Sequence, residues 1–68
     1  MENLKTRKEL CMIFGFSMST IERDLKVMRM DDYFKNFVHK MGSRLLKIEL
    51  KGYEEYLRYK EQEYKKAL

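Results

Sequence analysis

The 68-residue sequence predicts a small α+β domain that is mostly helical, in the order helix, helix, two-stranded hairpin, helix. Three observations predict this order: apolar residues at helical spacing up to residue 28, alternating apolar and charged residues over 44–50, and a long C-terminal segment without proline. We expect residues 1–68 to form one domain, in which residues from about 58 to 68 are a helical C-terminal extension. A core of this size is close to the lower limit for folding without disulfides or metal.

The first expected helix begins after Thr6. Thr6 and Glu9 have the spacing of a capping box, in which each residue satisfies a backbone amide of the other. The residues expected to face the core from this helix are Leu10, Ile13 and Phe14. The small Cys11 allows a second helix to approach closely, and Gly15-Phe16 forms the turn between the two helices.

A second helix is expected to begin near Ser17. Either Ser17 or Ser19 is its N-cap, and Ser19 with Glu22 would form a second capping box. The residues expected in the core are Ile21, Leu25 and Met28. Those left facing outward or into a groove are Met18, Thr20, Glu22, Arg23 and Lys26. Two short helices joined by a glycine-containing turn are typical of a helix-turn-helix, which places its second helix in the DNA major groove.

Residues 30–36 allow two interpretations. Asp31-Asp32 can cap a short helix that holds Phe34, Phe37 and Val38, or the segment is a loop whose aromatic side chains fold back on the core. We favour the loop.

A hairpin is expected after Phe37, because two short runs, FVHKM and RLLKIEL, flank Gly42-Ser43. Gly-Ser is a two-residue turn of the type with glycine first, so Lys40 and Arg44 would flank the tip. The expected inward residues are Leu46, Ile48 and Leu50, which alternate with Lys47 and Glu49.

The last helix is expected from about Lys51, with a stripe formed by Leu50, Tyr53, Leu57, Lys60 and Tyr64. This stripe is too short for a coiled coil, so its first half should pack on the domain while its last turns project into solvent. The complete order of elements predicts a winged helix-turn-helix domain.

The charge is unevenly distributed along the chain. The formal net charge is +4, and the residues from Tyr53 onward contain four acidic and four basic side chains. The whole basic excess therefore lies in residues 1–52, which favours a polyanionic partner for that part of the chain.

Several functions are disfavoured by what the sequence lacks. The single cysteine, Cys11, excludes an intramolecular disulfide, and the sole histidine, His39, has no metal-ligand neighbours at the required spacing. The sequence contains no phosphate-binding loop, paired carboxylate site or nucleophile-base arrangement. We therefore expect no enzymatic activity, no catalytic or metal-binding residues and no cofactor. With no secretion signal and no apolar run of about 18 residues, a cytoplasmic protein is expected.

The chain resembles the excisionases of phages and conjugative transposons, small winged-helix proteins related to the DNA-binding domains of mercury-resistance-type regulators. The resemblance covers roughly residues 5–57 and lies in three segments: SMSTIER at Ser17–Arg23, MGSR at Met41–Arg44, and KGYEEYL at Lys51–Leu57. The connection from Leu25 to Phe37 is longer than the family needs. The resemblance implies a protein of a mobile genetic element that binds and bends DNA beside an attachment site and directs integrase toward excision.

The partners implied are double-stranded DNA, with integrase or a second copy of the chain on the C-terminal helix, and neither a membrane nor a small molecule. The residues assigned to DNA are Ser17, Met18, Ser19, Thr20, Glu22, Arg23, Lys26, Lys40, Ser43, Arg44 and Lys47. Arg23 would contact bases or phosphates, and Arg44 would enter the minor groove or clamp the backbone. Glu22 caps the helix or accepts from a cytosine amino group, and Asp24 faces away from DNA; otherwise, these acids indicate that DNA binding has been lost.

Two other functions remain open at this point. A phage transcriptional regulator on the same fold would use the same chemistry at DNA, so the sequence does not separate it from an excisionase. A protein-interaction module, such as a phage or satellite accessory or interference protein, would instead use the tyrosines and methionines that protein interfaces favour.

Overall fold

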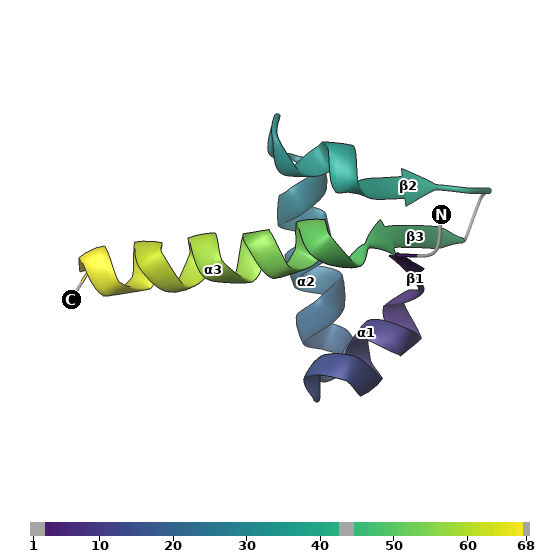
Figure 1. Ribbon diagram of the computed structural model, residues 1–68, viewed down its shortest axis with the longest axis horizontal. Coiled ribbons are helices and arrows are strands. Elements are labelled where there is room, and N and C mark those ends of the chain that lie inside the picture. Colours follow the sequence, from purple (N-terminus) through teal and green to yellow (C-terminus); the bar gives the residue numbers. More distant parts are fainter. Residues whose placement is uncertain (1–2, 43–44, 68) are drawn as a thin grey trace.

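A computed structural model describes residues 3–42 and 45–67, and these residues form an α+β fold that is mostly helical (Figure 1). In chain order the elements are β1 (Leu4–Lys5), α1 (Arg7–Phe14), α2 (Met18–Arg29), the 3-10 helix η1 (Phe34–Phe37), β2 (Val38–Lys40), β3 (Leu46–Glu49) and α3 (Leu50–Ala67). The strands form one antiparallel sheet with β3 between β1 and β2. In Figure 1, α3 crosses α2, and its C-terminal end points away from the sheet. β1 is not expected from the sequence, and η1 corresponds to the less favoured of the two interpretations of residues 30–36.

The start of α1 and the turn after it follow the sequence prediction. The Thr6 hydroxyl accepts from the Glu9 amide at 3.1 Å, and the Thr6 amide donates to the Glu9 carboxylate at 2.8 Å. This second bond holds the pKa of Glu9 below its ordinary value. Gly15 ends the helix with φ 71° and ψ 24°, a left-handed conformation that glycine adopts without steric cost, and its amide donates to the Cys11 carbonyl.

The buried face of α1 differs from the prediction at Ile13, whose side chain is 50% exposed while Leu10 is fully buried. Successive helical residues are rotated by about 100°, so Leu10 and Phe14 lie only about 40° apart, with Cys11 and Ile13 on opposite sides of this pair. The core packs on the side of Cys11, so Ile13 turns toward solvent. The expectation that Ile13 faces the core is therefore wrong.

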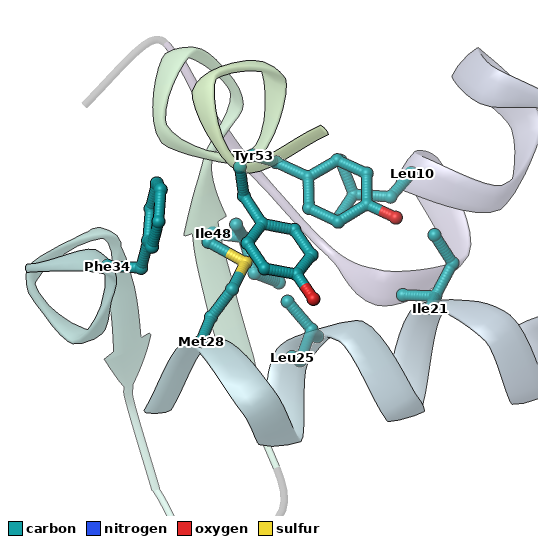
Figure 2. Packing of buried hydrophobic residues seen from close by; sticks show 8 residues of the cluster. Leu10, Ile21, Leu25, Met28, Phe34, Ile48 and Tyr53 are labelled. Atoms are coloured by element: carbon teal, nitrogen blue, oxygen red, sulfur yellow. The ribbon is translucent and has the colours of Figure 1, made fainter. Parts of the chain in front are cut away.

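The core forms where α1, α2, β3 and α3 meet (Figure 2). The predicted inward residues of α2 are confirmed: Ile21, Leu25 and Met28 are all buried. Ile48 of β3 is buried as expected, whereas Leu46 and Leu50 are half-buried and Leu50 already belongs to α3. From α3, Tyr53 and Tyr56 enter the core, and Leu57 only packs against its margin.

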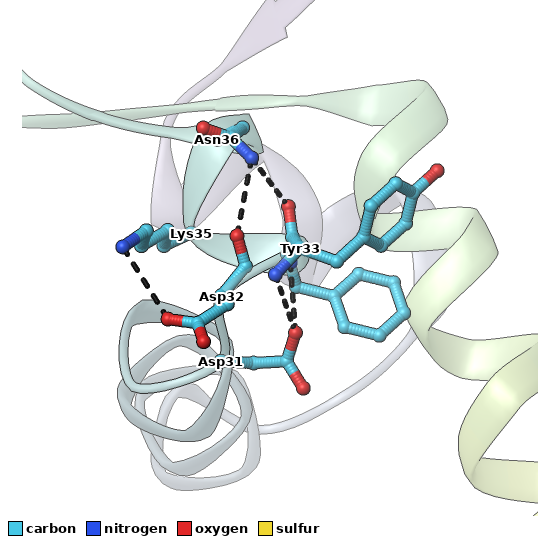
Figure 3. Close-up of polar contacts among 6 residues, drawn as sticks. Asp31, Asp32, Tyr33, Lys35 and Asn36 are labelled. Atoms are coloured by element: carbon cyan, nitrogen blue, oxygen red, sulfur yellow. Dashed lines mark hydrogen bonds and ion pairs between the residues drawn. The ribbon is translucent and has the colours of Figure 1, made fainter.

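Residues 31–37 contain a short helix and are not the loop that we favoured. One carboxylate oxygen of Asp31 accepts from the amides of Tyr33 and Phe34 at 2.8 and 3.0 Å (Figure 3). The Asn36 side-chain amide donates to the carbonyls of Asp32 and Tyr33. These bonds satisfy backbone groups that a loop would leave to solvent, and they direct Phe34 into the core.

The hairpin is longer at its tip than a two-residue Gly42-Ser43 turn allows, so that prediction is wrong; Ser43 itself lies outside the described residues. Lys40 pairs with Leu46, and the Met41 amide donates to the Leu45 carbonyl. A two-residue turn would move the register by one residue and pair Val38 with Lys47, placing a core side chain on the charged face. The observed register pairs Val38 with the buried Ile48 instead.

A buried carboxylate joins α2 to α3. Asp24, whose residue surface is 2% exposed, accepts from the Tyr53 hydroxyl at 2.8 Å and from the Lys60 ammonium at 2.9 Å. The ammonium also lies 5.6 Å from the centre of the Tyr56 ring. Burial, together with the carboxylate, raises the pKa of Tyr53 far above its ordinary range, so its hydroxyl stays a donor. Lys60, which seemed to interrupt the apolar stripe of α3, is thus part of this contact.

The approach of α3 to η1 requires a glycine at residue 52. A Cβ atom at Gly52 would overlap the Cβ and the ring of Phe37. The two elements are therefore in backbone-to-side-chain contact at this point, which explains a glycine inside a helix where alanine is otherwise preferred.

Within the described part of the chain, we find no helix with the length and apolar character needed to span a membrane.

Tyr53→Phe should lower the free energy of unfolding by about 1–3 kcal/mol, because it removes a donor from a buried carboxylate. Urea denaturation followed by circular dichroism measures the change. Tyr64→Phe is the matched control, since Tyr64 is 68% exposed, and it should stay within about 0.5 kcal/mol of the parent. Equal losses in the two variants would contradict the role given to the Tyr53 hydroxyl.

Gly52→Ala should destabilise the protein by about 1–3 kcal/mol, although alanine is the better helix former, because the new methyl group collides with Phe37 near its backbone. Thermal unfolding of a double-mutant cycle provides the test. In the background of Phe37→Gly, which removes the Cβ atom of residue 37 as well as its ring, the same Gly52→Ala change should become stabilising by up to about 1 kcal/mol. If Gly52→Ala instead stabilised the protein with Phe37 present, the predicted collision between the two residues would be contradicted.

Candidate nucleic-acid interface

The outward face of α2 consists of the residues that do not pack into the core. Ile21, Leu25 and Met28 point inward, so the 3.6-residue period turns the intervening positions other than the buried Asp24 toward solvent. The exposed residues of α2 that the sequence assigns to DNA are Met18, Ser19, Glu22, Arg23 and Lys26, while Thr20 is half-buried. These side chains lie on one helix.

The start of α2 identifies which serine is the cap. The Ser17 hydroxyl accepts from the Thr20 amide at 3.3 Å and lies 3.1 Å from the Thr20 hydroxyl. Ser17 is therefore the N-cap, and the alternative of a capping box between Ser19 and Glu22 is wrong. Ser19 lies inside the helix with an exposed side chain, and the Glu22 carboxylate is available for another contact.

A shallow groove runs beside this face between α2 and β3. Its volume is about 250 Å³, and it is lined by Arg7, Glu22, Leu25, Lys26, Arg29 and Leu46. Three of the lining side chains are cationic and one is anionic, so the groove is basic overall. Hydrogen-bond donors of arginine and lysine in such a position suit phosphate oxygens.

Sequence reasoning missed two of the cations in this groove. Arg29 was detectable, because Glu22, Lys26 and Arg29 follow one another at the four- and three-residue steps of a single helix face. Arg7 comes from α1, and nothing in the local sequence places it against α2. It reaches the groove only because the two helices cross at the Gly15 turn.

The two acids of α2 have separate partners. The Arg7 guanidinium donates to the Glu22 carboxylate at 3.1 Å in an ion pair whose side chains are 36% and 52% exposed. Asp24 is buried on the side of α2 that faces α3, so it faces away from the groove. Only Glu22 therefore brings negative charge to the outward face of α2.

The hairpin brings one of its two described lysines toward the groove. Lys40 is exposed and pairs with Leu46, so the two side chains project from the same face of the sheet, and Leu46 lines the groove. Lys47 pairs with His39 and projects from the opposite face. The structure therefore does not group Lys47 with Lys40. The other two predicted hairpin contacts, Ser43 and Arg44, lie outside the described residues.

His39 lies on the sheet face away from α2, where its Nε2 atom is 2.7 Å from a carboxylate oxygen of Glu49. A hollow of about 370 Å³ adjoins this pair and is lined by Asn3, Leu4, His39, Met41 and Glu49. Across residues 3–42 and 45–67 there is no group of three or more His, Cys, Asp or Glu side chains suited to holding a metal ion.

The cations of this surface thus come from α1 and α2, while Leu46 of β3 lines the groove and Lys40 of β2 projects from the same face of the sheet as Leu46. Comparison with protein-family models, with curated proteins and with solved structures finds no match to this chain.

Ser17→Ala should lower the free energy of unfolding by about 0.5–2 kcal/mol, because the amide of Thr20 loses its acceptor. Ser19→Ala, inside the same helix, should leave stability almost unchanged, since it removes only an exposed hydroxyl. Chemical denaturation of both variants distinguishes the two serines. A larger loss for Ser19→Ala would contradict the assignment of the cap.

Proposed function

We propose that this protein is a sequence-specific double-stranded DNA-binding protein of the winged helix-turn-helix class. In this proposal α2 enters the major groove and the hairpin of β2 and β3 is the wing. Support comes from the sharp Gly15 turn between α1 and α2, from the exposed polar face of α2, and from a hairpin that shares the groove with it.

The observation that carries the proposal is the basic groove beside α2. Arg7, Lys26 and Arg29 come from two helices and line one hollow, where they can contact phosphates beside an inserted helix. Arg23 lies on the exposed face of α2 and is the best-placed side chain for a base edge. The net positive charge of residues 1–52 also favours binding to a polyanion such as DNA.

Within this class, we propose the role of an excisionase of a phage or mobile element. Such a protein needs a small basic module whose contacts offset the energy of bending DNA. The resemblance in the segments at Ser17–Arg23, Met41–Arg44 and Lys51–Leu57 supports this role, and a phage transcriptional regulator on the same fold would use the same chemistry at DNA. The exposed side chains over 58–66 of α3 offer a surface for integrase or for a second copy of the chain.

A protein-interaction module is the second candidate function. The exposed aromatic side chains favour it: Tyr33 on one side of Phe34, and Tyr59 and Tyr64 along α3, are all about half-exposed or more. Tyrosine is enriched at protein interfaces, because it combines apolar area with a hydrogen-bonding group. This candidate predicts no affinity for duplex DNA.

The affinity for a duplex should fall steeply as salt rises, because each phosphate neutralised by lysine or arginine releases condensed counterions. Fluorescence anisotropy of a labelled duplex over a series of salt concentrations measures this slope. In the same experiment, Arg23→Ala should weaken binding to the preferred sequence by about 1–3 kcal/mol and relax its sequence preference.

The matched control is Arg58→Ala, which removes the same charge from an exposed position on α3 and should leave sequence preference unchanged. Circular dichroism must show that both variants remain folded. If the parent binds no duplex at low salt, the DNA proposal fails and the protein-interaction candidate is favoured.

A further inference from the structure

An exposed carboxylate on a surface that faces DNA needs a physical explanation. Glu22 lies on the groove side of α2, and phosphates would repel it unless its charge is neutralised or used. The Arg7 guanidinium neutralises it through one carboxylate oxygen, Oε2. The carboxylate carries a second oxygen, Oε1, that can accept a further hydrogen bond.

The ion pair between Arg7 and Glu22 contributes little to folding. Both side chains are partly exposed, and pairs of this kind are worth about 0–1 kcal/mol in stability. Its contribution to folding therefore does not account for this pair, which lies where the groove would meet a ligand.

We propose that Glu22 reads a cytosine in the major groove and that Arg7 is the positioning residue that orients it. This inference rests on the proposed DNA-binding function and deepens it. In the major groove cytosine presents only an amino donor, which a carboxylate accepts. Adenine places an acceptor beside its amino group, guanine presents two acceptors, and thymine presents an acceptor and a methyl group, so a carboxylate is less compatible with all three.

The neighbouring cations complete this arrangement. Lys26 and Arg29 follow Glu22 along the same groove and are suited to phosphates, which set the register of the helix on the duplex. Glu22 then provides selectivity at one base position. In this proposal Arg7, which projects from the first turn of α1, orients the carboxylate through its bond to Oε2.

The test begins with selection of preferred sequences from duplexes with randomised positions. The affinities for the selected duplex and for its three single-base variants at each position are then measured by anisotropy. The parent should prefer cytosine at one position by about 5- to 150-fold. Glu22→Gln should abolish that preference while raising the affinity for the other bases, because it removes a negative charge near phosphates.

Two further variants separate positioning from charge. Arg7→Gln should reduce the cytosine preference at the same position and leave the preferences elsewhere unchanged. Lys8→Gln, at an exposed position one residue along α1, removes the same charge and should lower all affinities without changing that preference. Arg7→Lys restores the charge and should recover part of the preference; it replaces Arg7→Gln should that variant fail to fold.

The outcomes are distinguishable. If the parent binds duplex DNA but the preference at every position is the same in Glu22→Gln and in the parent, the inference is overturned while the proposed function stands. Equal effects of Arg7→Gln and Lys8→Gln on base preference would overturn the positioning role of Arg7. Absence of any DNA binding by the parent at low salt would overturn the proposed function and this inference with it.

Discussion

The buried carboxylate of Asp24 is the contact on which the arrangement of α2 and α3 depends. A charge in the interior is costly unless it is paired and hydrogen-bonded, and here Tyr53 and Lys60 supply both requirements from α3. The donors come from residues 29 and 36 positions away in the sequence. Because both lie on one helix, α3 can take only the orientation that places them over Asp24.

This constraint also determines which face of α2 meets solvent. With one side of α2 committed to the core and to α3, the remaining surface carries Glu22, Arg23 and Lys26 outward, and Glu22 and Lys26 line the basic groove. The two acidic residues of α2 therefore have different roles. Asp24 is buried and stabilises the fold, whereas Glu22 is paired with Arg7 at the surface. The proposed function uses the face that this division leaves free.

Aromatic packing connects the hairpin to the same framework. Phe34 of η1 packs edge-on against Tyr56, with ring centres 5.3 Å apart, and Phe37 lies against Gly52. Since β2 follows η1 directly, these contacts position the hairpin relative to α3. The register that pairs Val38 with a buried strand residue then turns Lys40 to the face of the sheet that carries Leu46.

The sequence by itself determined the features that depend on residues close together in the chain. The capping box at Thr6, the Gly15 turn and the buried face of α2 follow from spacings of a few residues, as does the exposure of Arg23 and Lys26 in the candidate site. Only the tertiary structure decided the partners of Asp24, Glu22 and Lys60, the hairpin register, and the separation of Lys40 from Lys47. The physical reason is that a polar side chain looks the same in sequence whether it is solvated or paired. Its partner depends on how distant elements pack, which no local pattern encodes.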